Sequence, residues 1–130
     1  MAHILVVDDE QANRDLLAFL LGYFGHDVTT APEGESALRA ALADPPDLVV
    51  MDLAMPKVDG YTAAQLIRAE PTLDGVRMVA VSATSIASAE TASAAGFDAF
   101  YPFPLDPQDF MSFLEPFTQP SAAAGAKEHP

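Results

Sequence analysis

Three aspartates follow two short apolar runs of this chain, and their positions suggest metal and phosphate chemistry. Asp8 and Asp9 end the run that begins at His3, and Asp52 ends the run that begins at Asp47. No lysine or arginine lies within four positions of any of the three aspartates. If the fold brings these carboxylates together, repulsion drives at least one towards protonation unless a cation joins them. Oxygen ligands in this number suit Mg²⁺.

A third apolar run, "VAVS", ends in Ser82 and adds a hydroxyl group to the set. A carboxylate nucleophile, a metal-binding acidic pair and a hydroxyl donor are the parts needed to transfer a phosphoryl group onto Asp52. The alternative for each aspartate taken alone is a helix N-cap or a turn residue. That alternative weakens when three runs each end in a suitable group.

Apolar runs alternate with helical patterns five times along the chain. The runs predict strands over residues 3–8, 26–31, 47–52, 76–83 and 98–102. Helices are predicted over residues 10–25, 34–44, 61–70, 86–95 and 106–117. The first helix carries apolar residues at helical spacing, namely Leu16, Leu17, Leu20, Leu21 and Phe24.

This alternation predicts an α/β fold, a doubly wound parallel sheet with helices on both faces. The predicted strand order is 2-1-3-4-5. The first and third strands are continuous apolar runs and suit central positions, whereas the polar second strand and the fifth strand, with Pro102, suit edges. Ligands bind such sheets at the carboxyl ends of the strands where the order reverses. That point lies between Asp8–Asp9 and Asp52.

Composition and charge exclude several classes of function. The chain has 130 residues, enough for one domain, and a formal charge of −13 from 19 acidic and six basic residues. This balance argues against nucleic acid and against an anionic membrane surface as partners. Basic proteins and metal cations remain plausible. The absence of cysteine excludes disulfides and thiolate metal sites.

Neither a secretory signal nor a membrane span is evident in the sequence. The run "HILVV" is too short for a signal peptide, and no apolar run approaches the ~20 residues of a transmembrane helix. We therefore expect a cytoplasmic protein. Residues 1–118 are predicted to form the domain, and the small and polar residues 119–130 a disordered tail.

Four motifs, "ILVVDDE", "PDLVVMDLAMPKVDG", "VAVSAT" and "GFDAFYPFP", together resemble the response-regulator receiver domain of two-component signalling. The resemblance covers residues 3–118 and implies a flavodoxin-like (βα)5 fold. It implies a stand-alone regulator that a histidine kinase or histidine phosphotransfer protein phosphorylates and that signals through protein–protein contacts. It implies the following site: phosphorylation on Asp52, Mg²⁺ on Asp8, Asp9, Asp52 and the Ala54 backbone carbonyl, a phosphoryl hydrogen bond from Ser82 and a switch residue at Phe100.

One position departs from the family pattern. The family has a lysine immediately before Pro104, where this chain has Phe103, which offers neither a charge nor a donor. Lys57 and Arg14 are the candidate substitutes. The first hypothesis is therefore a phospho-switch with altered coupling, and the alternative is a pseudo-receiver that acts as an interaction or dimerisation module without phosphorylation. An enzyme such as an aspartate-dependent phosphatase is a distant third, because no DxD motif or glycine-rich phosphate loop is present.

Aromatic residues concentrate near the carboxyl terminus, where seven of eleven lie between Phe97 and Phe117. We expect Tyr101 and Phe103 to be exposed and Phe100 to point away from Tyr101. The predicted helix 86–95 is poor in large apolar residues and should be loosely held. This region is the candidate partner or homodimer face, with the residues Ile86, Tyr101, Phe103, Phe110, Phe113 and Phe117; helical spacing leaves the last three open between core and interface.

Overall fold

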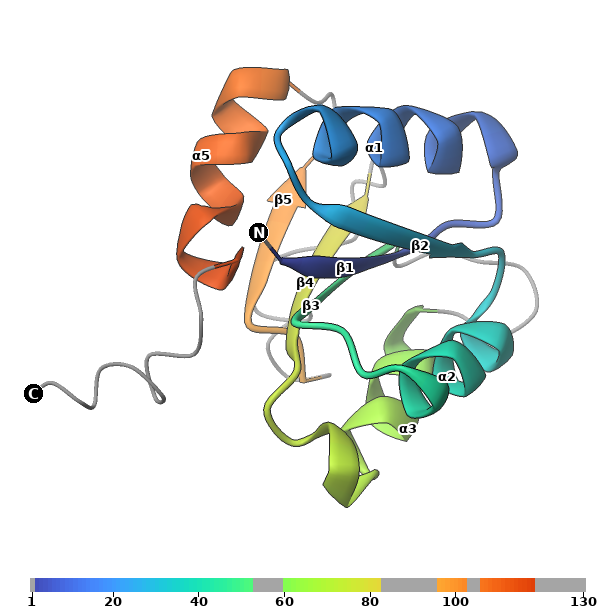
Figure 1. The fold of residues 1–130 in the computed structure, drawn as a ribbon. Helices are drawn as coiled ribbons and strands as arrows, with labels where there is room; N and C mark the ends of the chain where they lie inside the picture. Colours follow the sequence, from blue (N-terminus) through green and yellow to red (C-terminus); the bar gives the residue numbers. More distant parts are fainter. Residues whose placement is uncertain (1, 53–59, 83–95, 103–105, 119–130) are drawn as a thin grey trace, which may run out of the picture.

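The structure is a computed structural model that describes residues 2–52, 60–82, 96–102 and 106–118, with only the backbone described at residues 60, 61 and 82. Five parallel strands form one sheet, and helices cover both of its faces (Figure 1). The strands are β1 (His3–Val7), β2 (Asp27–Ala31), β3 (Leu48–Asp52), β4 (Arg77–Ser82) and β5 (Ala99–Pro102).

The strands are arranged in the order β2-β1-β3-β4-β5, which confirms the predicted topology. The central strands β1 and β3 are almost wholly buried, as their continuous apolar runs predicted. The edge strand β2 is mostly exposed, and β5 ends in the exposed Pro102. Proline is tolerated there because an edge strand pairs on one side only.

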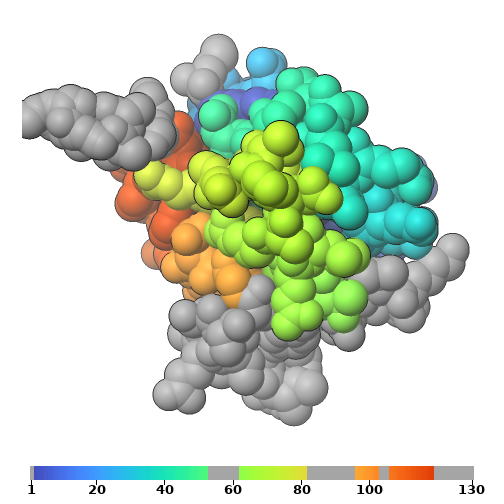
Figure 2. Space-filling model, turned by 90° about the horizontal axis from the view of Figure 1, so that it is seen from below, coloured from blue at the N-terminus to red at the C-terminus, as the bar shows by residue number. Residues whose placement is uncertain are grey.

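Two helices lie on each face of the sheet in the described part of the chain. Helices α1 (Gln11–Tyr23) and α5 (Pro107–Thr118) pack on one face, and α2 (Gly34–Ala43) and α3 (Gly60–Arg68) pack on the other. Figure 2 looks onto α2 and α3, which lie side by side. Side chains along β1 alternate between the two layers, with Leu5 and Val7 facing α2 and α3, and Ile4 and Val6 facing α1 and α5.

In the described part of the chain, the element boundaries agree with the sequence patterns to within two residues, and one short element was not predicted. The helix predicted over residues 61–70 ends at Arg68, and a short 3₁₀ helix, η1 (Pro71–Leu73), follows it. Pro71 causes this break because its ring removes the N–H that an α-helix would need. The predicted helix 86–95 and the predicted tail 119–130 lie outside the described residues. No helix in the described part of the chain is long and apolar enough to span a bilayer.

The prediction that Tyr101 is exposed is wrong. Its side chain is only 7% exposed and lies in the core beneath α5, with its ring centroid 4.8 Å from that of Phe110 and 5.2 Å from that of Phe113. The hydroxyl donates a hydrogen bond to Asp109 at 2.8 Å. Burial is the main reason why the pKa of this phenol is raised, and the bond to Asp109 adds to it.

The predicted aromatic face is thus largely a core in the described residues. Phe110 is fully buried, while Phe113 and Phe117 are partly buried against the same cluster. Phe100 packs against the opposite layer from Tyr101, as strand alternation predicted. Phe103 and Ile86 lie outside the described residues. Tyr101 is buried beneath α5 because every second side chain of β5 points towards that helix.

We predict that Tyr101→Phe lowers the free energy of unfolding by about 1 kcal/mol, because it removes the bond to Asp109 and keeps the ring. Phe110→Ala should cost about 3–5 kcal/mol, because it leaves a cavity in the core. Urea unfolding followed by circular dichroism measures both changes. Tyr23→Phe is the matched control, since the Tyr23 side chain is exposed, and its stability should not change. Equal losses for the two tyrosine variants would contradict this account.

Candidate functional site

The three aspartates meet at the carboxyl edge of the sheet, as the sequence predicted. Val7 pairs with Met51 across β1 and β3, so Asp8 follows beside Asp52. Ligand oxygens of Asp8, Asp9 and Asp52 all lie within 4.8 Å of one another. Asp8 is buried, Asp9 is exposed and Asp52 is partly exposed. The cluster therefore has a closed inner side and an open outer side.

Asp8 is the buried member of this cluster. Its side chain is 1% exposed, and its Oδ1 accepts a hydrogen bond from the Glu10 N–H at 2.9 Å. Its Oδ2 is buried without a hydrogen-bond partner among the described residues. Burial raises the pKa of Asp8 above 3.8, and the charges of Asp9 and Glu10 raise it further; the Glu10 N–H and the Asn13 amide offset part of the shift.

These features fit a hard divalent cation. A buried carboxylate oxygen without a partner costs free energy unless a cation or a donor meets it. Carboxylate oxygens are the ligands that Mg²⁺ takes, usually together with water and a substrate phosphate. Asp8, Asp9 and Asp52 could hold such an ion. The Ala54 carbonyl, a further ligand implied by the resemblance, lies outside the described residues.

The turn between β1 and α1 holds Asp8 in place through two residues that sequence reasoning did not single out. Asp8 and Glu10 form a turn in which a carboxylate accepts the N–H two residues on, a local pattern typical of aspartate. Asn13 donates its amide to Glu10 Oε1 at 3.0 Å. Arg14, a candidate substitute for the lysine, donates to the backbone carbonyl of Asp8 at 2.8 Å. Arg14 therefore anchors the turn and lies on the same edge as the cluster.

The other predicted site residues are placed only in part. Asp52 pairs with Val81 of β4, and Ser82 is the next residue, so the Ser82 backbone lies on the same edge. The Ser82 side chain is outside the described part of the structure. Phe100 is partly buried in the layer that contains α2 and α3. Lys57 and Phe103 lie outside the described residues.

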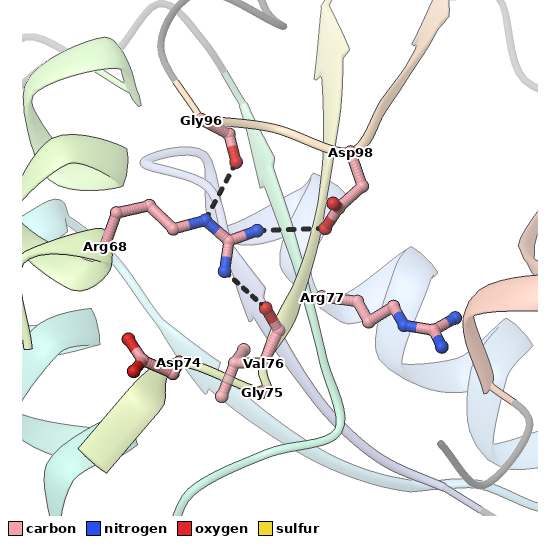
Figure 3. A pocket seen from close by; sticks show the side chains of 7 residues that line it. All are labelled: Arg68, Asp74, Gly75, Val76, Arg77, Gly96 and Asp98. Carbon is pink, nitrogen blue, oxygen red and sulfur yellow. Dashed lines mark hydrogen bonds and ion pairs between the residues drawn. The ribbon is translucent and has the colours of Figure 1, made fainter. Parts of the chain in front are cut away.

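A cleft of about 520 Å³ lies far from this chemistry, at the amino ends of β4 and β5. Figure 3 shows Arg68 of α3 reaching across it, with donors to the Gly96 carbonyl (2.9 Å), the Val76 carbonyl (2.6 Å) and the Asp98 carboxylate (2.9 Å). The Arg77 side chain points away from Arg68 and donates to a carbonyl of α5. Both arginines thus tie elements together, and the cleft has a structural role.

Gly96 is one of the residues that Arg68 contacts. Its φ of +106° is rarely adopted by residues with a side chain, and an added Cβ would lie 2.9 Å from Arg68 Cγ. Glycine is therefore required at this position for the backbone and for the close approach of Arg68. The Arg68 contacts hold the residues just before β5, at the end of the sheet opposite the carboxylates.

Comparisons with known proteins agree with this site. The family model for the response regulator receiver domain matches residues 4–115. An uncharacterised 14.6 kDa protein of Leptolyngbya boryana is 36% identical over 117 residues, which cover 88% of each chain. A probable transcriptional regulator, ycf27, of Porphyridium aerugineum is 37% identical over 82% of this chain, but this chain spans only 43% of its length.

Among solved structures, the receiver domain of the sensor histidine kinase PA1611 from Pseudomonas aeruginosa is similar in fold and sequence. It superposes with a TM-score of 0.82 and 27% identity, covering 90% of this chain and 97% of that one. That structure holds a magnesium ion in its active-site cleft. The acidic cluster described above is therefore consistent with a phospho-acceptor site that uses Mg²⁺.

We predict that Asp8→Asn makes the metal-free protein more stable, by about 1 kcal/mol or a few degrees in Tm at neutral pH. The folded-state pKa of Asp8 is above its unfolded value of 3.8, so ionising Asp8 costs stability as the pH rises through this range. The advantage of Asp8→Asn should therefore be absent near pH 4 and grow towards pH 7. Thermal melts in EDTA at several pH values measure it.

The same variant should lose its response to metal. Mg²⁺ at ten times its Kd should stabilise the wild-type protein by about 1.4 kcal/mol, because the ion binds the folded state only. Asp8→Asn and Asp9→Ala should each remove this gain, whereas Asp74→Asn, a change at an exposed aspartate on the opposite edge, should keep it. A wild-type melt that is insensitive to Mg²⁺ would rule out the metal site.

Proposed function

Since the chain belongs to the response regulator receiver family, we propose that it accepts a phosphoryl group on Asp52 from a histidine kinase or a histidine phosphotransfer protein and signals by protein–protein contacts in the cytoplasm. The observation that carries the proposal is the convergence of Asp8, Asp9 and Asp52 within 4.8 Å of one another, together with the buried Oδ2 of Asp8, which has no hydrogen-bond partner among the described residues. The Leptolyngbya boryana relative matches this chain over 88% of both lengths. This match supports a stand-alone regulator whose receiver domain is formed by residues 1–118.

The three aspartates divide the work according to their exposure. Asp52 is the nucleophile, because it ends β3 and is partly exposed, so a phosphodonor can reach it. Asp8, Asp9 and Asp52, with the Ala54 carbonyl that the resemblance implies, would hold Mg²⁺. When bound, the ion would neutralise charge on the phosphoryl oxygens, as metal ions do in phosphoryl transfer generally. Because Asp8 is buried, the inner side of the site is closed to bulk solvent.

The transfer uses these residues, Ser82, the metal ion, water and the phosphodonor. An Asp52 carboxylate oxygen bonds to phosphorus as the P–N bond of the phosphohistidine breaks. The departing imidazole nitrogen keeps the electron pair of that bond and takes a proton from water. The Ser82 hydroxyl donates a hydrogen bond to the transferred group. Water later attacks phosphorus, which releases phosphate and restores the Asp52 carboxylate. The protein is thus a phospho-acceptor that assists its own phosphorylation and dephosphorylation rather than an enzyme with a separate substrate.

Phe103 weakens the coupling between phosphorylation of Asp52 and the change to the switched conformation. A charge-assisted hydrogen bond is worth roughly 1.5–3 kcal/mol, and phenylalanine cannot provide one. Phosphorylation therefore stabilises the switched state less than a lysine would allow. The second candidate function rests on the same residue: a pseudo-receiver that binds partners without phosphorylation. Arg14 is held by the Asp8 carbonyl, which limits its reach as a replacement cation.

We predict that a small-molecule phosphodonor with Mg²⁺ adds one phosphoryl group to the wild-type protein. Asp52→Asn should remove the adduct because it removes the nucleophile, and EDTA should also prevent it. Intact-mass spectrometry at neutral pH measures the adduct. Asp74→Asn is the control and should be phosphorylated normally, since this exposed residue lies in the loop before β4. Failure of every donor and kinase to modify Asp52 would leave the pseudo-receiver as the better account.

We predict that Phe103→Lys strengthens the response to phosphate. Beryllium fluoride, a phosphoryl mimic, should bind this variant about tenfold or more tightly than the wild-type protein, because the lysine restores one charge-assisted bond. Fluorine NMR or calorimetry measures the affinity. Leu42→Lys adds the same charge at an exposed position of α2 and should change nothing. Equal affinities of all three proteins would mean that another cation already meets the phosphoryl group.

A further inference from the structure

The exposed apolar surface of the described residues lies mainly on α1. Six large hydrophobic side chains are exposed in the described part of the chain, and four of them belong to α1 or to the residue after it: Leu16 (51%), Phe19 (71%), Tyr23 (77%) and Phe24 (45%). We call these four residues the α1 face. The core contacts of α1 are made by Leu17 and Leu21 on its other side. The α1 face therefore lies outside the core of the described residues.

The aromatic rings of the α1 face are arranged as one continuous surface. The Phe19 and Tyr23 rings are stacked with centroids 6.5 Å apart, and the Tyr23 and Phe24 rings meet edge to face at 5.4 Å. Leu16, Phe19 and Tyr23 follow an i, i+3, i+7 spacing, which places them on one stripe of the helix. A stripe of this kind is typical of a helix that packs against another helix, and solvent exposure leaves it without that partner.

Gly22 gives an independent indication of close contact. Gly22 lies in the last turn of α1, and a glycine inside a helix costs up to about 1 kcal/mol relative to alanine. Nothing in the described structure lies within 4 Å of a Cβ placed there, and its φ is not in the left-handed region. The fold of one chain therefore gives no reason for glycine at this position. A second surface approaching the α1 backbone closely beside Phe19 and Tyr23 would give one.

The charge pattern identifies which partner suits this face. The chain carries a formal charge of −13, so two copies repel each other wherever their acidic surfaces meet. Residues 16–25 contain no Asp, Glu, Lys or Arg. The α1 face is thus a neutral, apolar patch on an acidic chain. A basic partner would find no acidic side chain to pair with at this patch, whereas an identical copy can pack on it without placing like charges opposite each other.

We propose that the α1 face is the contact surface of a homodimer, in which the same four side chains of two copies pack across a two-fold axis. Such an interface is self-complementary by symmetry. The exposed parts of the four side chains offer about 450 Å² per copy, from the usual areas of aromatic and leucine side chains, against the ~800 Å² of a standard stable interface. The dimer should therefore be weak and depend on protein concentration. It differs from the predicted face around β5 and α5, where Tyr101 and Phe110 are buried.

Sedimentation velocity on the full chain tests this proposal. The wild-type protein should shift from monomer towards dimer between about 10 µM and 1 mM, as a small interface predicts. Raising the salt concentration should strengthen association, because salt screens the repulsion between two acidic chains and leaves apolar contact intact. Phe19→Ala/Tyr23→Ala should stay monomeric over the same range. Circular dichroism should show that this variant remains folded, since both side chains are exposed.

Two control variants locate the contact. Leu42→Ala removes a leucine of similar exposure (43%) from α2 and should dimerise like the wild-type protein. Phe117→Ala changes the partly buried end of α5 and should also dimerise. A wild-type protein that stays monomeric at 1 mM would overturn the proposal. So would association that survives in Phe19→Ala/Tyr23→Ala or that Phe117→Ala abolishes.

The absence of cysteine from the chain allows a second, covalent test. Phe19→Cys places one thiol at the centre of the α1 face, close to the two-fold axis, and oxidation should link two copies in high yield at high protein concentration. Leu42→Cys places a thiol at an exposed position outside the face and should link only slowly. Equal rates of cross-linking for the two variants would overturn the proposal.

Discussion

The carboxylate of Asp8, buried at the end of β1 next to two further carboxylates, is the constraint on which the site depends. One of its oxygens is held by the Glu10 N–H, and the other has no partner among the described residues. A charge in this position opposes folding unless a cation meets it. The acidic cluster therefore carries an electrostatic cost, which a bound cation would offset. This is how a phospho-acceptor site can couple ion, phosphate and protein shape.

The remainder of the structure supports this edge of the sheet. Two apolar layers bury β1 and β3, so the strands that deliver Asp8 and Asp52 cannot shift relative to each other. Arg14 secures the turn at the site, while Arg68 closes the opposite edge by joining α3 to the starts of β4 and β5. Rigid support of this kind matters because ligands of Mg²⁺ must be held close to octahedral geometry.

Aromatic residues of this chain serve two separate purposes. On β5 and α5 they form a core in which Tyr101 keeps its hydroxyl satisfied by Asp109. On α1 they largely face solvent, where exposed rings lower solubility and lie outside the core of the described residues. Phe103 adjoins the first group in sequence, and at this position the family pattern has a lysine. A receiver with weaker phosphate coupling and an apolar contact face would depend more on association for its signal.

The sequence by itself determined the strand order and the meeting of Asp8, Asp9 and Asp52. Parallel strands bring their carboxyl ends to one edge, and the burial of each strand follows from its own composition. Only the tertiary structure decided that Asp8 is the buried member, that Tyr101 is covered by α5, and that Leu16 is exposed whereas its neighbour Leu17 is buried. Periodicity tells which residues share a face, but the exposure of that face depends on which distant segments pack against it. That is a long-range property, which local sequence patterns do not contain.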